Sequence, residues 1–161
     1  MNTPAATDST VGCALRRMVQ TDLTAILEIE RVSYPSPWSR RAFETELVTT
    51  WAAPMVAVEP GPAGERVVGY ACSWHVADEV QLLNVAVHPA RRRQGVGQAL
   101  VCEVLRQAAA RGARAVLLEV RVANLGARRL YTGLGFRPTG IRRGYYGPGQ
   151  DGVLMEWRQG G

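Results

Sequence analysis

Glycines and arginines meet at the start of a predicted helix. Gly95 and Gly97 lie in its first turn, and Arg92 and Arg93 come directly before them. The first N–H groups of a helix have no intrahelical partner and carry the positive end of the helix dipole, so they can bind an anion. Glycine lets a phosphate approach the backbone, and arginine adds charge and forked donors. The segment therefore predicts a phosphate-binding loop.

Two familiar phosphate loops do not fit this segment. A P-loop requires GxxxxGK[ST], which the chain lacks. A dinucleotide-binding loop requires a third glycine where Leu100 stands, and an acid about twenty residues later, near Val116 and Leu117. A glycine-rich helix start with solvated arginines stays open as the alternative.

A carboxylate and a phenol follow the loop. Glu119 lies within an apolar run, LLEV, where an acid is costly unless it has a role. Tyr131 comes twelve residues later, one strand end and two helical turns away, so both can approach the carboxyl end of the central strands. A charged strand end and an ordinary helix aromatic are the alternative interpretations.

Local signals predict the elements that would position these residues. Apolar runs and alternation indicate strands over residues 13–18, 55–59, 66–74, 80–87, 115–120 and 152–157, with another beginning at Phe136. Expected N-caps at Thr21-Asp22, Ser39 and Asn124, together with helical periodicity, indicate helices over 21–33, 39–48, 95–112 and 124–134. The run 115–120 is expected to be buried on both faces. This order, β-α-α-β-β-β-α-β-α-β-β, describes a mixed α/β fold.

The loop and the strand before it resemble the GNAT superfamily of N-acetyltransferases. RRQGVG, residues 92–97, is similar to its Q/R-x-x-G-x-G/A motif, and the likeness runs from about Leu15 to Trp157. It implies an α/β (α+β) fold with a mixed, mostly antiparallel sheet of six to seven strands, splayed in the middle, and about four helices. It also implies acetyl-CoA as cosubstrate, bound by Val85, Ala86, Val87, Arg92, Arg93, Gln94, Gly95, Val96, Gly97 and Gln98.

Two later segments resemble a narrower family, the bacterial ribosomal-protein alanine N-acetyltransferases of the RimI type. They are LEVR-x-x-N, residues 118–124, and LYxxLGF, residues 130–136. The resemblance implies Glu119 as general base, Tyr131 as general acid and Asn124 as a further acetyl-CoA contact. The implied reaction is direct acetyl transfer to the N-terminal α-amino group of a protein, foremost the N-terminal alanine of a small-subunit ribosomal protein.

Aromatic loops would form the acceptor side. Trp38, Tyr145 and Tyr146 are the expected substrate-binding residues, and IRRGYY, which ends at Tyr146, resembles the family's substrate-side strand and loop. The family usually follows Tyr-Tyr with a spacer and then Glu-Asp-Ala. Here a shorter Gly-Pro-Gly leads to Gln150-Asp151-Gly152, so an amide replaces one carboxylate that could hold a cationic peptide.

Size and composition fit one globular domain. The 161 residues match a single domain over 1–161, with residues 1–11 expected to be a disordered tail. Cys13, Cys72 and Cys102 are odd in number and set in apolar contexts, so we expect buried thiols in a reducing cytoplasm and no metal site. No apolar run is long enough for a membrane helix. The expected partner is a protein N-terminus in transient contact, without membrane or nucleic acid.

The net charge of +5, carried by arginine without any lysine, keeps two alternatives open. The same fold could acetylate a small amine such as an aminoglycoside or a polyamine. A basic surface could also belong to a non-catalytic CoA- or nucleic-acid-binding module. Glu119 and Tyr131 argue against that module, because mere binding has no use for a base and an acid.

Overall fold

The computed structural model describes residues 12–160 as seven strands and four α-helices. The strands are β1 (Ala14–Arg17), β2 (Met55–Gly61), β3 (Gly64–Val76), β4 (Glu79–Val87), β5 (Ala115–Arg121), β6 (Arg137–Arg142) and β7 (Gly152–Arg158). The helices are α2 (Leu23–Ser33), α3 (Arg40–Val48), α4 (Val96–Ala110) and α5 (Leu125–Gly133), with 3-10 turns η1 (Gln20–Asp22) and η2 (Pro89–Arg91). The predicted order is confirmed. The tail expected over residues 1–11 lies outside the described residues.

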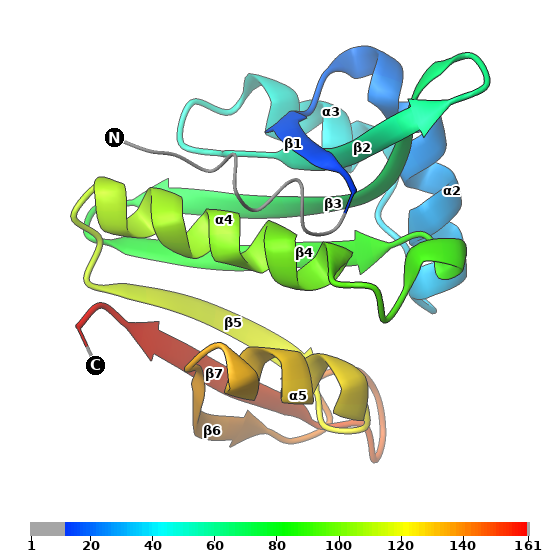
Figure 1. Ribbon diagram of the computed structural model, residues 1–161. Helices are drawn as coiled ribbons and strands as arrows, with labels where there is room; N and C mark the ends of the chain where they lie inside the picture. The colour runs from blue at the N-terminus through cyan, green and yellow to red at the C-terminus, as the bar shows by residue number, and fades with distance from the viewer. Residues whose placement is uncertain (1–11, 161) are drawn as a thin grey trace.

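One sheet joins the seven strands in the order β1-β2-β3-β4-β5-β7-β6 (Figure 1). Each neighbouring pair is antiparallel except β4–β5, which is parallel. A parallel pair needs a crossover connection, and α4 supplies it. The mixed, mostly antiparallel sheet is therefore confirmed. Among residues 12–160, no helix is long and apolar enough to cross a membrane.

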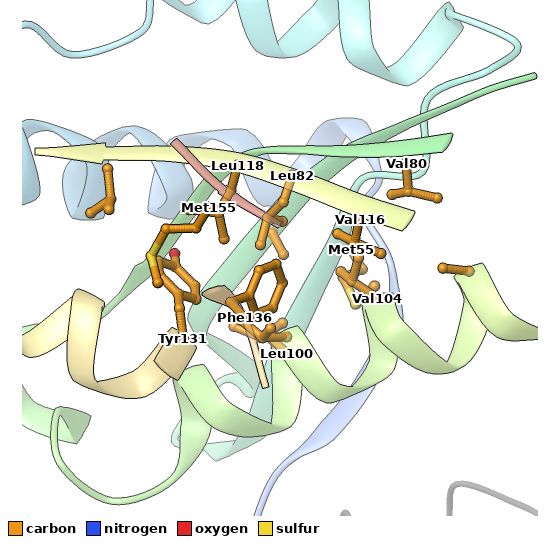
Figure 2. Close-up of a cluster of buried hydrophobic side chains, with 14 of the residues drawn as sticks. Met55, Val80, Leu82, Leu100, Val104, Val116, Leu118, Tyr131, Phe136 and Met155 are labelled. Carbon is orange, nitrogen blue, oxygen red and sulfur yellow. The ribbon is translucent and has the colours of Figure 1, made fainter. Parts of the chain in front are cut away.

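The helices cover the two faces of the sheet and form two cores. α4 and α5 lie on one face, where Leu100, Val104 and Phe136 belong to the larger apolar cluster (Figures 1 and 2). α2 and α3 lie on the other face, where Phe43 packs edge-on against Tyr70 of β3, with ring centroids 5.6 Å apart. Each helix buries one apolar face against the sheet, as amphipathic periodicity requires.

β5 is fully buried on one face and only partly buried on the other, so the expectation for residues 115–120 was wrong. Val116, Leu118 and Val120 point into the α4–α5 core, whereas Leu117 and Glu119 on the other face are half-buried. The physical reason is the limited extent of the α2–α3 layer on that face, because α2 packs on β3 and β4. The apolar run therefore did not require a helix on each side of this strand.

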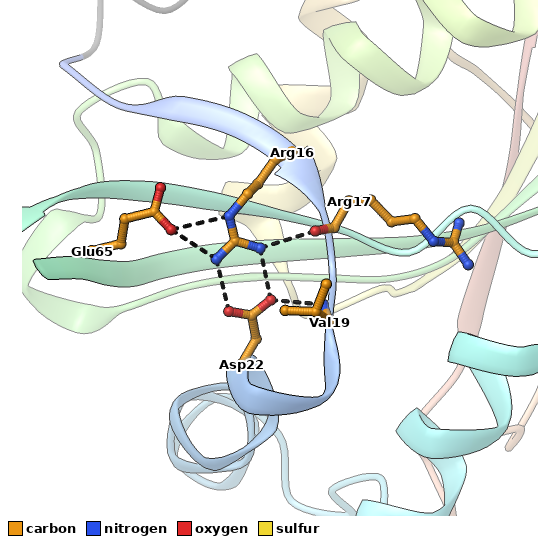
Figure 3. Close-up of polar contacts among 5 residues, drawn as sticks. All are labelled: Arg16, Arg17, Val19, Asp22 and Glu65. Carbon is orange, nitrogen blue, oxygen red and sulfur yellow. Dashed lines mark hydrogen bonds and ion pairs between the residues drawn. The ribbon is translucent and has the colours of Figure 1, made fainter.

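Asp22 does not cap α2 as expected but closes the corner that leads into it (Figure 3). Its carboxylate accepts a hydrogen bond from Val19 N at 2.8 Å. It also accepts one from each terminal nitrogen of the Arg16 guanidinium, both at 2.9 Å. Burial alone would raise the pKa of Asp22, but the hydrogen bonds from Arg16 and Val19 outweigh burial and lower that pKa. Arg16 also bonds Glu65, at 3.0 Å. This cluster joins β1, the start of α2 and the β2–β3 hairpin.

β4 and β5 pair over four positions and then separate. Their register runs from Glu79 opposite Ala115 to Leu82 opposite Leu118 and goes no further. The register between β3 and β4 shifts at the same point, which leaves Leu83 as an extra residue in β4. A bulge of this kind bends a strand and ends its pairing. The splay expected in the middle of the sheet is therefore confirmed, and its local cause is the bulge at Leu83.

Gly69 of β3 should be intolerant of a side chain because α4 packs directly over it. A Cβ there would lie 3.0 Å from Ala86 O, 3.1 Å from Leu100 Cδ1 and 3.2 Å from Val96 Cγ1. We expect Gly69→Ala to lower the free energy of unfolding by about 1–3 kcal/mol through overpacking, measured by urea denaturation. Gly126→Ala is the matched control, because it adds a methyl group where no atom lies within 4 Å. Equal stability of the two variants would contradict this account of α4 packing.

Candidate active site

The segment of β4 after the bulge, residues 83–87, has no strand partner on its β5 side, and we call it the open β4 edge. His88 N donates to Val68 O across to β3. Because successive peptide groups of a strand point to opposite sides, Ala86 also directs its N–H and C=O toward β3. Val85 and Val87 direct theirs toward the open side. Of the three residues expected to meet the cofactor here, only Val85 and Val87 have main-chain groups to offer.

Side chains donate hydrogen bonds to the main-chain carbonyl groups of this edge. The Tyr34 hydroxyl donates to Val85 O, and Arg92 Nε donates to Val87 O at 3.0 Å. Arg92 also donates to Ser33 Oγ at 3.0 Å, so its guanidinium is engaged at the end of α2. The open β4 edge therefore presents N–H donors, which suits a ligand that offers carbonyl oxygens along an extended arm.

The glycine loop leads into α4 with the geometry that an anion site needs. Gly95 has a φ of +89°, a left-handed conformation that glycine adopts without strain. Ala99 N donates to Gly95 O, so the earlier N–H groups of Val96, Gly97 and Gln98 have no carbonyl within the helix. The Val96 side chain is buried in the core, whereas that of Gln98 is exposed. The main chain, rather than these side chains, is what the loop offers to a phosphate.

The polar side chains of the glycine loop differ in the contacts that they make within the protein. Arg91 forms an ion pair with Glu59 and donates to Gln94 Oε1 at 2.8 Å. Gln94 donates in turn to Ala90 O at 3.1 Å. Arg93 has a φ of +61° and an exposed side chain. Both arginines expected to bind phosphate are exposed, but Arg92 is held by its hydrogen bonds to Val87 O and Ser33 Oγ.

Asn124 caps α5, as its sequence position indicated. Its Oδ1 accepts from Ala127 N at 3.2 Å, which leaves the side-chain amide nitrogen for another partner. The first turn of α4 lies against the second half of α5 and the end of β4, because a Cβ on Gly97 would lie 3.6 Å from both Leu130 Cδ2 and Val87 Cγ2. The two helices lie together on one face of the sheet (Figure 1).

Glu119 lies on the opposite face of β5. Its side chain is 19% exposed, and Arg142 Nε approaches its Oε1 to 3.6 Å. Its Oε2 is buried and has no hydrogen-bond partner among residues 12–160. A Cβ on residue 152 would lie 2.9 Å from this oxygen, so the absence of a side chain at Gly152 makes room for the Glu119 carboxylate. A buried carboxylate oxygen without a donor is costly, which is typical of a group kept for a substrate.

Tyr131 reaches the strand separation from the other side. It projects from α5 into the larger core, is 8% exposed, and its ring centroid lies 5.6 Å from that of Phe136 (Figure 2). Burial raises the pKa of Tyr131 to about 12, and the nearby Tyr146 adds to the rise. Tyr131 in turn contributes, after burial, to the raised pKa of Tyr34. Three phenols, from α5, the β6–β7 loop and the end of α2, thus lie close enough to interact electrostatically.

The three residues expected to bind the acceptor have different surroundings. Trp38 packs on Phe43, with centroids 5.2 Å apart, and so anchors the start of α3. Tyr145 and Tyr146 pack edge-to-face at 5.0 Å in the β6–β7 loop. Tyr146 lies against Glu119, because a Cβ on Gly152 would touch both side chains. The structure therefore brings Tyr146 to the candidate base and uses the Trp38 ring mainly in packing.

Two site residues were missed by the sequence analysis, Tyr34 and Glu30. Glu30 is 1% exposed; its Oε1 accepts from the Tyr70 hydroxyl and from Asn84 Nδ2 at 2.9 Å, and its Oε2 accepts from Trp38 N at 2.8 Å. The sequence contained a signal for Glu30, because a residue seven positions after Leu23 lies on the same face of the helix and therefore faces the core. Nothing local to Tyr34 indicated its bond to β4.

Comparison with known proteins identifies the class of enzyme. Residues 23–136 match the model of the Acetyltransferase (GNAT) family. The chain is 35% identical over 132 residues to the [Ribosomal protein bS18]-alanine N-acetyltransferase of Escherichia coli (strain K12), covering 82% of this chain and 85% of that protein. It is 31% identical over 145 residues to the enzyme of that name from Haemophilus ducreyi (strain 35000HP / ATCC 700724), covering 88% and 97%.

Solved structures agree with this match. The crystal structure of the ribosomal-protein-S18-alanine N-acetyltransferase from Escherichia coli superposes with a TM-score of 0.81 at 31% identity, covering 91% of this chain and 93% of that one. The chain therefore belongs to the GNAT family of acetyltransferases. It is an acetyltransferase, and acetyl-CoA is its cosubstrate. The donors of the open β4 edge and of the α4 mouth suit the carbonyl oxygens and phosphates of that molecule.

Bulk at Gly97 should block the mouth of α4. We expect Gly97→Leu to weaken acetyl-CoA binding at least ~10-fold, because each lost charge-assisted hydrogen bond is worth about 1.5–3 kcal/mol. Isothermal titration calorimetry would measure the change. Gly97→Ala is the graded control, since its Cβ would meet Leu130 and Val87 at an ordinary 3.6 Å. Unchanged affinity in the leucine variant, with a normal melting temperature, would rule out phosphate binding at this loop.

Proposed function

We propose that this protein transfers the acetyl group of acetyl-CoA to the N-terminal α-amino group of a protein, and that its acceptor is the N-terminal alanine of the ribosomal protein bS18. The relatives that share about a third of its residues over most of both chains carry that name. One structural observation carries the proposal: the Glu119 carboxylate, whose buried Oε2 has no hydrogen-bond partner among residues 12–160, and a protonated phenol, Tyr131, flank the strand separation from opposite faces.

The open β4 edge and the α4 mouth would hold the donor. The N–H groups of Val85 and Val87 suit the carbonyl oxygens of the pantetheine arm and of the thioester, and those of Gly97 and Gln98 suit the diphosphate. A main-chain donor aimed at a developing oxyanion is worth roughly 3 kcal/mol in comparable sites. These groups lie on elements held by the larger core, so they would be oriented before the donor arrives.

Glu119 would remove the proton that the acceptor amine must lose. A free α-amino group has a pKa near 8, so it is mostly protonated at neutral pH, and only the neutral amine attacks a thioester. The buried Oε2 of Glu119 has the free lone pairs that this proton needs. Its position on the α2 face of β5 means that the acceptor would approach from the side opposite α4 and α5.

Tyr131 would donate to the departing thiolate. A thiol has a pKa near 8.5, and burial raises that of Tyr131 to about 12. Complete proton transfer is then uphill by about 3.5 units, or roughly 5 kcal/mol. Tyr131 would therefore act as a strong hydrogen-bond donor to the developing charge and release its proton only as the carbon–sulfur bond breaks.

Mass spectrometry of acetylated products tests the proposal. The protein is incubated with acetyl-CoA and either a peptide carrying the bS18 N-terminus, its N-terminally blocked form, or a panel of aminoglycosides and polyamines. Acetylation of the α-nitrogen of the free peptide, with none on the blocked peptide, is the expected result. Acetylation of small amines alone would replace the proposed acceptor with that class.

Loss of the Tyr131 hydroxyl should slow the chemical step. We expect Tyr131→Phe to lower kcat by ~10²–10⁴, the usual worth of a general acid, with acetyl-CoA affinity unchanged. Steady-state kinetics and calorimetry would separate the two quantities. Tyr145→Phe is the matched control, since that exposed phenol should influence KM for the acceptor rather than kcat. Normal turnover of Tyr131→Phe would exclude it as the acid.

The raised pKa of Tyr131 also predicts the alkaline part of the pH profile. The acid must be protonated to act, and with a pKa of about 12 it stays protonated far above neutrality. We therefore expect kcat/KM to rise as the acceptor amine loses its proton near pH 8 and then to stay level to about pH 10.5. A decline in kcat/KM centred near pH 9–10 that disappears in Tyr131→Phe would contradict the raised pKa of Tyr131.

A further inference from the structure

Glu30 is a buried carboxylate to which the proposed chemistry gives no task. It lies near the end of α2, and both of its oxygens accept hydrogen bonds. Its Oε1 accepts from the Tyr70 hydroxyl and from Asn84 Nδ2 at 2.9 Å, and its Oε2 accepts from Trp38 N at 2.8 Å. A buried carboxylate needs such donors to offset its lost hydration. Glu30 therefore joins β3, β4 and the α2–α3 loop.

Asn84 connects Glu30 to the open β4 edge. The pairing of β4 with β3 resumes at Asn84, directly after the bulge at Leu83. The Asn84 side chain is buried, and its amide nitrogen donates to Glu30. Because the C=O of Asn84 and the N–H of Val85 share one planar peptide group, the orientation of Asn84 sets the direction of the Val85 N–H. The hydrogen bond to Glu30 thus orients a main-chain donor of the open β4 edge.

Tyr34 holds the next peptide group from the same end of α2. It follows Glu30 by four residues, and its main-chain N–H donates to Glu30 O at 3.1 Å. Its hydroxyl donates to Val85 O, which belongs to the peptide group between Val85 and Ala86. One turn of chain at the end of α2 therefore holds two successive peptide groups of β4. A donor held from both sides needs no reorganisation when charge develops on its ligand.

We propose that Glu30 is a positioning residue for acetyl transfer, which acts through Asn84 to aim the Val85 N–H at the thioester oxygen. The inference rests on the proposed function, in which that N–H group faces the developing oxyanion. An oxyanion donor is worth about 10²–10³ in kcat, and a displacement of about 1 Å can cost ~10²-fold. The diphosphate would bind at the α4 mouth, on the other face of the sheet, so Glu30 should influence kcat far more than CoA affinity.

A matched pair of variants tests the inference, because Asn84 and Tyr70 donate to the same oxygen of Glu30. Asn84→Ala removes the donor on β4, and Tyr70→Phe removes the donor on β3. We expect Asn84→Ala to lower kcat ~10–100-fold and to leave CoA affinity within ~2-fold, whereas Tyr70→Phe should keep kcat within ~3-fold. Acetylation of a peptide with the bS18 N-terminus gives kcat, and isothermal titration calorimetry gives the CoA affinity.

Glu30→Met links the effect to Glu30 itself. The variant keeps an unbranched side chain but removes every acceptor, so kcat should fall at least as far as in Asn84→Ala. Adding Asn84→Ala to Glu30→Met should lower kcat by less than ~3-fold further, because members of one network are not additive. If Glu30→Met does not fold, the matched pair decides the question.

Three results would overturn the inference alone: normal kcat in Asn84→Ala, an equal fall in Tyr70→Phe, or a loss of CoA affinity that parallels the loss of kcat. Failure of the native protein to acetylate the peptide, while a small amine reacts, would instead overturn the proposed acceptor. The same variants would then be compared with that amine, and the same three results would apply.

Discussion

A parallel strand pair that stops after four residues leaves main-chain groups that must find other partners. Here the pairing of β4 with β5 ends at Leu82 and Leu118, and the bulge at Leu83 turns the following residues away. Buried peptide groups without hydrogen bonds are costly. The protein satisfies part of this need with two side chains, Tyr34 on Val85 O and Arg92 on Val87 O. What remains is a row of donors in the centre of the sheet.

The bulge also decides which side chains support this row. Before it, Val80 and Leu82 face the larger core, and after it, Val85 and Val87 do so. Asn84 and Ala86 consequently face α2, where Asn84 meets Glu30. A buried carboxylate is expensive unless fully hydrogen-bonded, and Glu30 receives donors from β3, β4 and the loop at Trp38. This network ties the α2–α3 loop to the edge that it borders.

The two faces of the separated strands provide different chemistry. α4 and α5 bring main-chain donors and the buried Tyr131 to one face, and the half-covered face of β5 brings Glu119 with Tyr146 and Arg121. A donor molecule held on one side and an amine approaching from the other would meet between them. This separation keeps the Glu119 carboxylate away from the Tyr131 hydroxyl, since direct contact would let the two groups satisfy each other.

The sequence by itself determined the features that depend on neighbouring residues. The glycine loop before α4, the caps Ser39 and Asn124, and the order of strands and helices all follow from contacts a few residues apart. Short-range rules misjudged Asp22, whose partner Arg16 lies across a corner, and the second face of β5, where burial depends on how far α2 extends. Local patterns contain no information about such distances.

Only the tertiary structure decided which residues meet at the strand separation. Tyr34 and Val85 are 51 positions apart, Glu30 and Asn84 are 54 apart, and Arg121 and Gln150 are 29 apart. Each contact depends on how separate elements pack, and the types of residue involved are compatible with many other partners. Glu119 and Tyr131 could be selected as candidates from their sequence context. Their placement on opposite faces of one opening results from the parallel crossover through α4 and from the bulge in β4.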